Sequence, residues 1–314
     1  MLNRELEEFI RYIDLEKGYS PRTVEGYRSD LLQFQAFLGK NGWAVELDGL
    51  GRTRGIDPVA IRKYLAQLHR DKLKRTSIGR KLAALKSFFR YLAKRGLLER
   101  NPAEFIGTPK KEKHVPVFLT VDEVFAILDK PLPEGRAALR NRAMIELLYT
   151  SGIRRAELVG LNCADIDFKG ALLKVRGKGK KERIVPVGAE ALESMAAYRD
   201  RERVEPPPEE SRGQEDPFFT NPKGRRLSPR TISRIVDDVA ARGGVNRKIT
   251  PHVFRHTFAT HLLDGGADLR VIQEMLGHES LSTTQKYTSV SVAKLMKIYD
   301  AAHPRSRRDG KKNE

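Results

Sequence analysis

The chain contains very little cysteine and no long apolar run. Cys163 is the only cysteine among 314 residues, which excludes an internal disulfide and is typical of proteins in a reducing compartment. Its apolar neighbours indicate a packing role. No apolar stretch approaches the ~20 residues of a membrane-spanning helix, and the opening MLNRELEEFI lacks the apolar core of a signal peptide. We therefore expect a cytoplasmic protein without a membrane partner.

The chain also lacks the usual sequence patterns of metal and nucleotide sites. It has no H-E-x-x-H pattern, no paired cysteine and histidine spacing of a zinc site, and no G-x-x-x-x-G-K-[ST] phosphate loop. No convergent set of carboxylates that could hold a catalytic metal stands out either. We therefore expect chemistry that needs neither a metal nor another cofactor.

Acidic residues are scarce relative to basic ones. With 59 Lys and Arg against 41 Asp and Glu, the formal net charge is +18 and the isoelectric point is about 10.0. Such an excess attracts polyanions and makes their binding depend on salt. Charge alone does not separate DNA from RNA or from an anionic membrane, so the choice of partner depends on the motifs.

One helix is predicted to present two cationic side chains near its start. Thr250 followed by Pro251 is typical of an N-cap and a first helical residue, which predicts a helix to about Leu263. His252 and Arg255 then lie on its first turn. The unpaired backbone N–H groups and the helix dipole at that end favour an anion such as phosphate.

Two further residues of interest follow this helix. Asp268 is predicted to cap a second helix that runs to Met275, with Gly277 just past its end and His278 directly after the glycine. Tyr287 is predicted on another short helix. An isolated H-x-x-R is more often a surface pair, and an isolated tyrosine is more often half-buried than reactive. Only the joint pattern indicates chemistry on a phosphodiester.

The joint pattern resembles the tyrosine recombinase (phage integrase) family. The family's C-terminal signature is H-x-x-R, then L-G-H, then a tyrosine nine residues after the second histidine, and residues 252–255, 276–278 and Tyr287 match it. The family's G-[LI]-R-x-x-E-L turn is matched by residues 152–158, and its G-K-G-x-K-E-R hairpin by residues 177–183. By this resemblance the catalytic residues are Arg154, Lys178, His252, Arg255, His278 and Tyr287.

The resemblance implies a covalent reaction with DNA. Tyr287 would attack the phosphodiester and form a 3′-phosphotyrosine, while Arg154 and Arg255 bind the non-bridging oxygens as planar, bidentate donors. A tyrosine with an ordinary pKa near ~10 needs help to lose its proton, and either His252 or His278 could serve as the base. We favour His252 as the base, with His278 hydrogen-bonded to the phosphate and Lys178 as the general acid. Arg155 is expected to be a surface or DNA-backbone cation, and Glu157 either an orienting partner for an arginine or a helix cap.

The fold is predicted to be mainly α with a small β-hairpin or sheet, arranged as a two-domain clamp. Residues 171–187 are typical of two short strands around a glycine-rich basic turn, although a solvated turn alone would also fit. We predict a helical core-binding (SAM-like) domain over residues 1–106, a linker over 107–120, a catalytic domain over 121–303 and a disordered basic tail over 304–314. The N-terminal domain is expected to be all helical, with helices at 3–17, 20–38, 57–70 and 77–94 and DNA contacts at Arg22, Arg28, Arg75 and Arg80.

Within the family, the chain resembles the Xer branch, since residues 299–305 are Y-D-A-A-H-P-R and no additional arm-binding domain is seen. That branch implies resolution of chromosome dimers at a terminus (dif-type) site during cell division. It also implies double-stranded DNA in a tetrameric synapse with the same chain or a paralogous, XerD-like recombinase, and a DNA translocase (FtsK-like) as activator. The helix after Tyr287 would be exchanged between protomers, with packing on its own chain as the alternative. A phage or mobile-element integrase, a type IB topoisomerase and a catalytically silent architectural protein are the competing functions. One sequence does not reveal the target site.

Overall fold

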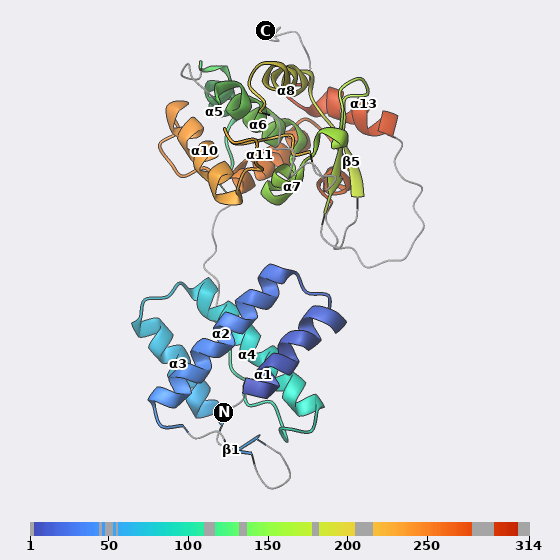
Figure 1. The fold of residues 1–314 in the computed structure, drawn as a ribbon. Helices are drawn as coiled ribbons and strands as arrows, with labels where there is room; N and C mark the ends of the chain where they lie inside the picture. The colour runs from blue at the N-terminus through green and yellow to red at the C-terminus, as the bar shows by residue number, and fades with distance from the viewer. Residues whose placement is uncertain are drawn as a thin grey trace. The chain divides into compact units, whose positions relative to one another are not determined.

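The computed structural model divides the chain into two compact units, Met1–His114 and Val115–Glu314 (Figure 1). It describes residues 3–43, 46–47, 53–54, 56–109, 117–131, 137–177, 182–204, 216–277 and 292–306. The division falls inside the segment predicted as a linker. Helices dominate both units and a small antiparallel sheet lies in the second, so the predicted mainly α fold class is confirmed. None of the described helices is both long enough and apolar enough to cross a membrane.

The N-terminal unit packs four α-helices around an aromatic and aliphatic core. These helices are α1 (Asn3–Arg11), α2 (Pro21–Lys40), α3 (Pro58–Arg70) and α4 (Arg75–Lys94). The side chains of Ser20 and Asp57 accept hydrogen bonds from the first turns of α2 and α3, so both helices begin within a residue of their predicted starts. Leu82, Leu85, Phe89 and Leu92 lie at helical spacing on one face of α4, and all four are buried.

Three details of this unit differ from the sequence prediction. The first helix does not continue regularly to Lys17, because α1 ends at Arg11 and a π-helical turn, η1 (Tyr12–Glu16), follows. Helix α4 begins at Arg75 rather than Ser77. The unit is also not wholly helical, since β1 (Glu46–Leu47) pairs with β2 (Thr53–Arg54). Strands of two residues are too short to show an alternating pattern, so the sequence did not reveal them.

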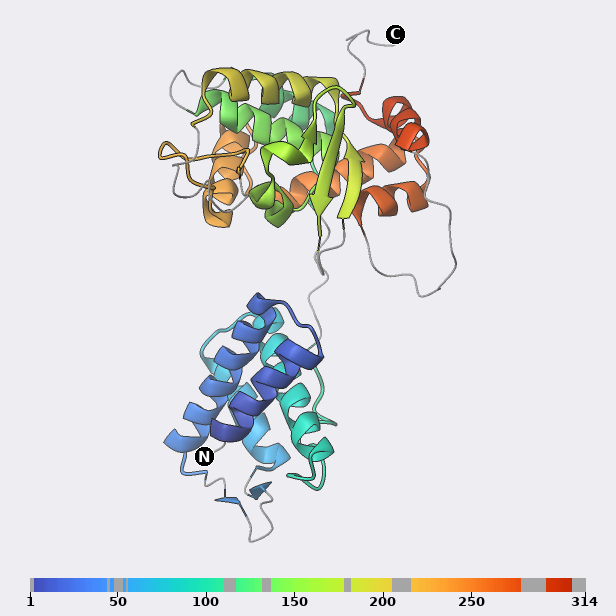
Figure 2. The same ribbon diagram turned by 45° about the vertical axis from the view of Figure 1, so that its right-hand side comes forward.

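The C-terminal unit is built around a central helix, α6 (Ala138–Ser151), whose residues are buried on nearly all sides. Helices α8 (Ala189–Arg201) and α11 (Pro251–Asp264) pack against it (Figure 2). The other described helical elements are α5 (Val121–Asp129), α7 (Arg155–Gly160), η2 (Cys163–Asp165), α10 (Pro229–Arg242), α12 (Leu269–Leu276) and α13 (Val292–Ala302).

A three-stranded antiparallel sheet lies in this unit, in the order β3 (Ile166–Asp167), β4 (Leu172–Arg176), β5 (Glu182–Pro186). The two strands predicted for residues 171–187 are confirmed as β4 and β5, and they pair in the register Val175 to Arg183. Leu173, Val175 and Val185 face the core. The short strand β3 was not predicted.

The end of the chain folds against the same unit. Helix α13 packs on α11 and β5 of its own chain, the alternative to helix exchange. The prediction of a disordered tail from residue 304 is wrong for residues 304–306, since Arg305 is buried and binds Glu146 and Asp129 at 2.8 and 2.9 Å. A buried partner carboxylate outweighs the tendency of a basic tail to remain solvated. Residues 307–314 lie outside the described residues.

Candidate active site

Three of the six predicted catalytic residues line one open cavity of about 540 Å³. Arg154 comes from the turn between α6 and α7, and His252 and Arg255 come from the first turn of α11. The helix begins at Pro251 as predicted, although the Thr250 side chain makes no capping hydrogen bond. His252 is exposed to solvent, and Arg255 is nearly buried at 6% exposure. The structure therefore brings together an arginine pair and a histidine from segments about 100 residues apart.

Both arginines are anchored on the same two turns. The Arg255 guanidinium donates from Nη1 to the Gly152 carbonyl at 2.7 Å and from Nη2 to the Leu276 carbonyl at 2.6 Å. Arg154 donates from Nη2 to the Gly277 carbonyl at 2.9 Å. Gly152 ends α6 and Gly277 ends α12, each in the left-handed conformation that glycine favours. The backbone that leads directly into residue 278 is therefore fixed to the arginine pair.

The Arg255 guanidinium is buried, so its charged form is less well solvated than that of a surface arginine. Loss of solvent, together with the neighbouring Arg154 cation, lowers the pKa of its guanidinium to about 10. Arg255 therefore stays protonated at neutral pH. A buried cation beside a second cation is poorly solvated, so it interacts strongly with an anion that enters the cavity.

Glu157 supplies the negative charge that balances this cluster. Burial alone would raise the pKa of its carboxyl group, but hydrogen bonds from Arg183 and from the Arg154 backbone N–H outweigh that effect and leave the pKa below its usual value. The carboxylate binds the Arg154 side chain at 2.9 Å and the Arg154 backbone N–H at 2.6 Å. It is thus both the orienting partner and the helix cap that the sequence left open.

Arg155 points to a different partner from its neighbour Arg154. Its Nη1 donates to the Ser233 hydroxyl at 2.6 Å, and both residues line the rim of the same cavity. Arg155 was expected to be a surface or DNA-backbone cation, and it lies on the same cavity as Arg154 and Arg255. Cys163 is half-buried against the core, where burial raises the pKa of its thiol to about 12.

The other three predicted catalytic residues, Lys178, His278 and Tyr287, lie outside the described residues. The described chain stops at Gly177, one residue before Lys178, and at Gly277, one residue before His278. Sequence reasoning singled out no role for Arg183, although it stands at the end of the G-K-G-x-K-E-R motif. The place of this arginine in the motif, within a predicted hairpin, was the available signal.

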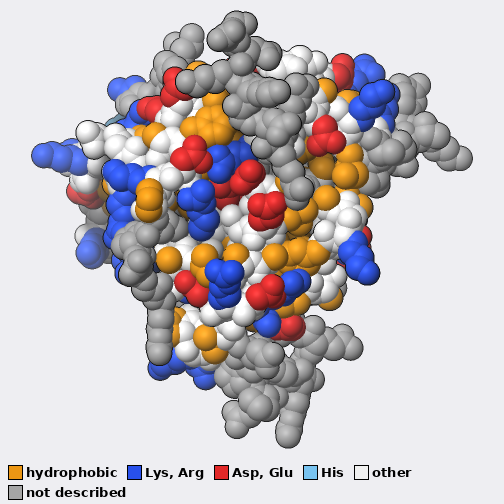
Figure 3. Space-filling view, turned by 90° about the horizontal axis from the view of Figure 1, so that it is seen from above, with side chains coloured by type: hydrophobic (Ala, Val, Ile, Leu, Met, Phe, Trp, Pro, Cys, Tyr) orange, Lys and Arg blue, Asp and Glu red, His pale blue; other side chains and the backbone are white. Residues whose placement is uncertain are grey.

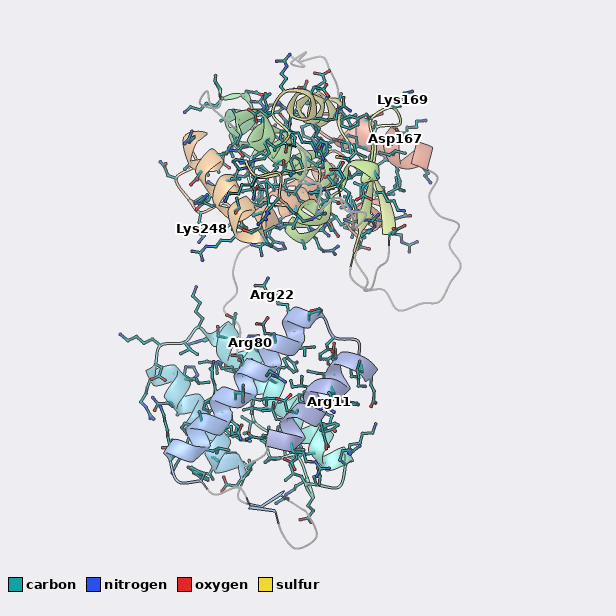
Figure 4. All side chains as sticks on the ribbon, viewed as in Figure 1. Arg11, Arg22, Arg80, Asp167, Lys169 and Lys248 are labelled. Atoms are coloured by element: carbon teal, nitrogen blue, oxygen red, sulfur yellow. The ribbon has the colours of Figure 1, made fainter. Side chains whose placement is uncertain are left out.

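The four predicted DNA-contacting arginines are exposed on the N-terminal unit. Arg28 forms an ion pair with Glu7, and Arg80 forms one with the buried Asp30. Figure 4 labels Arg22, Arg80 and Arg11 on this unit, and in that view Arg11 lies apart from the other two. On the face of the molecule seen in Figure 3, basic side chains are interspersed with acidic ones. That face therefore does not form a continuous basic surface.

Comparison with known proteins identifies the class. Residues 117–294 match the Phage integrase family, and residues 6–96 match the Phage integrase, N-terminal SAM-like domain. Together with the arginine pair and histidine around an open cavity, these matches define a site-specific DNA strand-transferring enzyme. The chain belongs to the phage integrase family, the tyrosine recombinases, which confirms the resemblance seen in the sequence.

The proteins to which the chain is similar are recombinases and integrases. The chain is 46% identical to the tyrosine recombinase XerC of Syntrophus aciditrophicus over 96% of this chain and 98% of the relative. It is 43% identical to that of Thermodesulfovibrio yellowstonii over 97% of both. Among solved structures, XerH recombinase bound to its difH substrate matches 82% of this chain and 74% of that one, with 25% identity and a TM-score of 0.65. A lambda integrase dimer on a core site, 19% identical over 91% of this chain and 99% of that one with a TM-score of 0.66, shows the same fold.

Proposed function

We propose that the chain cuts and rejoins double-stranded DNA through a covalent bond between Tyr287 and a 3′-phosphate. The observation that carries this proposal is the convergence of Arg154, Arg255 and His252 on one open cavity. Both arginines are also bonded to the turn that immediately precedes His278. An arginine pair of this kind suits the trigonal bipyramidal transition state of a phosphodiester, where negative charge grows on the non-bridging oxygens.

The proposed reaction assigns one task to each of the six residues. The Tyr287 oxygen forms a bond to phosphorus, the bond from phosphorus to the 5′-oxygen breaks, and the two arginines stabilise the charge that develops. His252 accepts the tyrosine proton, His278 donates a hydrogen bond to the phosphate, and Lys178 protonates the departing 5′-oxygen. The phosphotyrosine retains the bond energy, so a 5′-hydroxyl from a partner duplex can reseal the strand without a nucleotide cofactor or a metal.

We further propose that the cellular task is resolution of chromosome dimers at a dif-type site during cell division. The support is near full-length similarity to proteins named XerC and the fold shared with XerH on difH DNA. In this role four subunits, identical or paired with an XerD-like paralogue, would form the synapse, and an FtsK-like translocase would activate it in the cytoplasm. A phage or mobile-element integrase would use the same chemistry at a different site.

The nucleophile is tested with a nicked suicide duplex that carries a dif-type site. Wild-type protein is expected to form a denaturant-resistant adduct that maps to Tyr287, and Tyr287→Phe is expected to form none while it binds the duplex with an unchanged Kd. Peptide mapping after nuclease digestion locates the modified residue. Tight binding without an adduct, alone or with a paralogue, would instead identify a catalytically silent DNA-binding protein.

We also propose that the N-terminal unit, residues 1–106, contacts DNA through Arg22, Arg28, Arg75 and Arg80, and closes with the catalytic unit around the duplex. Replacing Arg22 by alanine is expected to weaken binding at every sequence and to reduce the slope of log K against log salt by about 1, as loss of one phosphate contact does. Arg11→Ala is the matched control, since Arg11 is exposed on the same unit but lies apart from Arg22 in Figure 4. Equal slopes for the two variants would place the DNA elsewhere.

A further inference from the structure

We propose that Arg183 is a positioning residue of the reaction, which holds Glu157 so that the Arg154 guanidinium remains available to the DNA phosphate. This inference rests on the proposed function. Arg183 lies on β5, opposite Val175 of β4, and its side chain is 15% exposed. It does not line the cavity formed by Arg154 and Arg255. Its effect on the reaction must therefore pass through another residue.

Arg183 and Arg154 share a single buried carboxylate. The Glu157 side chain is only 4% exposed. Its Oε1 accepts from Nη1 of Arg183 at 2.7 Å and from Nη1 of Arg154 at 2.9 Å. Its Oε2 accepts from Nη2 of Arg183 at 2.8 Å and from the Arg154 backbone N–H at 2.6 Å. A carboxylate has about four lone-pair sites, so these contacts fill its capacity.

The division of these contacts determines how Arg154 is held. Arg183 takes half of the acceptor capacity with a bidentate fork, the strongest geometry for this pair. Arg154 therefore binds Glu157 through only one side-chain nitrogen, its Nη2 reaches the Gly277 carbonyl, and its side chain stays 42% exposed. Without Arg183 the buried carboxylate would lose two of its four hydrogen-bond donors and one of the two guanidinium cations that bind it. The guanidinium of Arg154, the adjacent cation, would then rotate toward the vacated oxygens of Glu157. It would no longer be placed to bind the DNA phosphate.

Arg183 also fixes the backbone on the other side of the site. Its Nε donates to the Met275 carbonyl at 2.8 Å, near the end of α12. A Cβ added to Gly277 would stand 3.1 Å from Cδ of Arg183, so the two residues are closely packed. Since the Nε and both Nη atoms of Arg183 bind protein acceptors, the side chain is built to hold the site rather than to contact DNA.

The test compares Arg183→Met with Arg176→Met, a control on the adjacent strand whose guanidinium binds Asp165 and Glu182 outside this network. Single-turnover formation of the Tyr287 adduct is measured on the suicide duplex at saturating protein, and thermal unfolding verifies that each variant is folded. We expect Arg183→Met to lower the rate by about 100-fold, the scale of losing one transition-state donor. Arg176→Met is expected to remain within about threefold of wild type.

Two further comparisons separate positioning from a general structural defect. On DNA whose scissile phosphate carries a methyl group in place of one non-bridging oxygen, the phosphate is neutral, so a defect that acts through Arg154 should shrink to about tenfold or less. In Arg183→Met combined with Glu157→Gln, the neutral amide no longer attracts Arg154, and at least about tenfold of the rate should return. If Arg183→Met proves unstable, Arg183→Lys, which keeps the charge but loses the fork, is measured in the same way.

The outcomes distinguish this inference from the function on which it rests. A wild-type protein that forms no adduct overturns the proposed function, and this inference with it. A wild-type protein that cleaves while Arg183→Met matches Arg176→Met overturns the inference alone. The same holds if the Arg183→Met defect is equal on charged and neutral phosphates and is not relieved by Glu157→Gln.

Discussion

Replacing Gly152 by alanine is expected to destabilise the C-terminal unit by about 2–5 kcal/mol and to slow adduct formation at least about 100-fold. Gly152 has a φ of +58°, where a Cβ costs about 1–2 kcal/mol. That Cβ would also stand 2.3 Å from Cδ1 of Phe258, whose ring is fully buried. Relief of the clash requires movement of the core or of the turn, which costs about 1–3 kcal/mol.

The effect on the reaction follows from the position of the turn. The Gly152 carbonyl holds Arg255, and Arg154 stands only two residues further along the chain. A shift of this turn therefore displaces both cations of the site, and misplacement of about 1 Å can cost about 100-fold in rate.

Denaturant unfolding and single-turnover cleavage measure the two effects of Gly152→Ala. Gly266→Ala is the matched control, because Gly266 has a φ of +85° in the same unit but no atom within 4 Å of an added Cβ. The control should show only the cost of the left-handed backbone. Equal losses of stability in the two variants would contradict a steric role for Phe258.

Replacing Arg305 by methionine is expected to destabilise the C-terminal unit by up to about 3–5 kcal/mol, the usual cost of stranding a buried charge. Arg305 binds both oxygens of Glu146, at 2.8 and 3.2 Å, and the Glu146 side chain is 1% exposed. Arg142 at 3.5 Å remains as a weaker partner for the carboxylate. Resistance of the C-terminal segment to proteolysis should fall together with the unfolding free energy.

The loss of stability in Arg305→Met should depend on pH in a defined direction. Burial already raises the pKa of Glu146, although Arg305 opposes the shift, so removal of Arg305 raises it further. A carboxyl with a raised pKa in the folded state binds a proton more readily than in the unfolded state. The loss of stability caused by its buried charge therefore becomes smaller as pH falls. The difference in Tm between wild type and variant should therefore be smaller at about pH 5 than at about pH 8.

Two controls accompany this measurement. Arg247→Met removes an ion pair with Glu123 in which both side chains are partly exposed, and it should cost no more than about 1 kcal/mol. Glu146→Leu combined with Arg305→Met removes both buried charges and should recover part of the loss. A double variant less stable than Arg305→Met would show that the pair does not act as a unit.

Local sequence signals located most of the helices and three of the residues that line the cavity of the candidate site. Helices α2 and α3, capped by the side chains of Ser20 and Asp57, begin within a residue of their predicted starts, and the strands around the basic turn form the expected hairpin. The shared cavity of Arg154 and Arg255 follows the motif register. The catalytic roles of all six residues remain predictions, and Lys178, His278 and Tyr287 also lie outside the described parts of the chain.

The pairings that complete the site could not be predicted from local patterns. The Arg183 to Glu157 pair joins residues 26 apart, and the Arg305 to Glu146 pair joins residues 159 apart. Periodicity reports which face of a helix is buried, but not which charges meet there. The basic composition of the C-terminal end favoured a solvated tail for the same reason, since the buried carboxylate that attracts Arg305 lies on a distant helix.

The arginine pair is held largely by backbone carbonyls, which every amino acid possesses. Substitution of Leu276 changes a side chain but leaves the acceptor of Arg255 in place. Insertion of one residue into α12 would instead rotate that carbonyl by about 100° and move it by about 1.5 Å. Apart from Gly152 and Gly277, whose left-handed backbone restricts the side chain, these turns therefore tolerate changes of residue identity but not changes in chain length. Relatives that retain activity should differ here by exchanges and not by insertions or deletions.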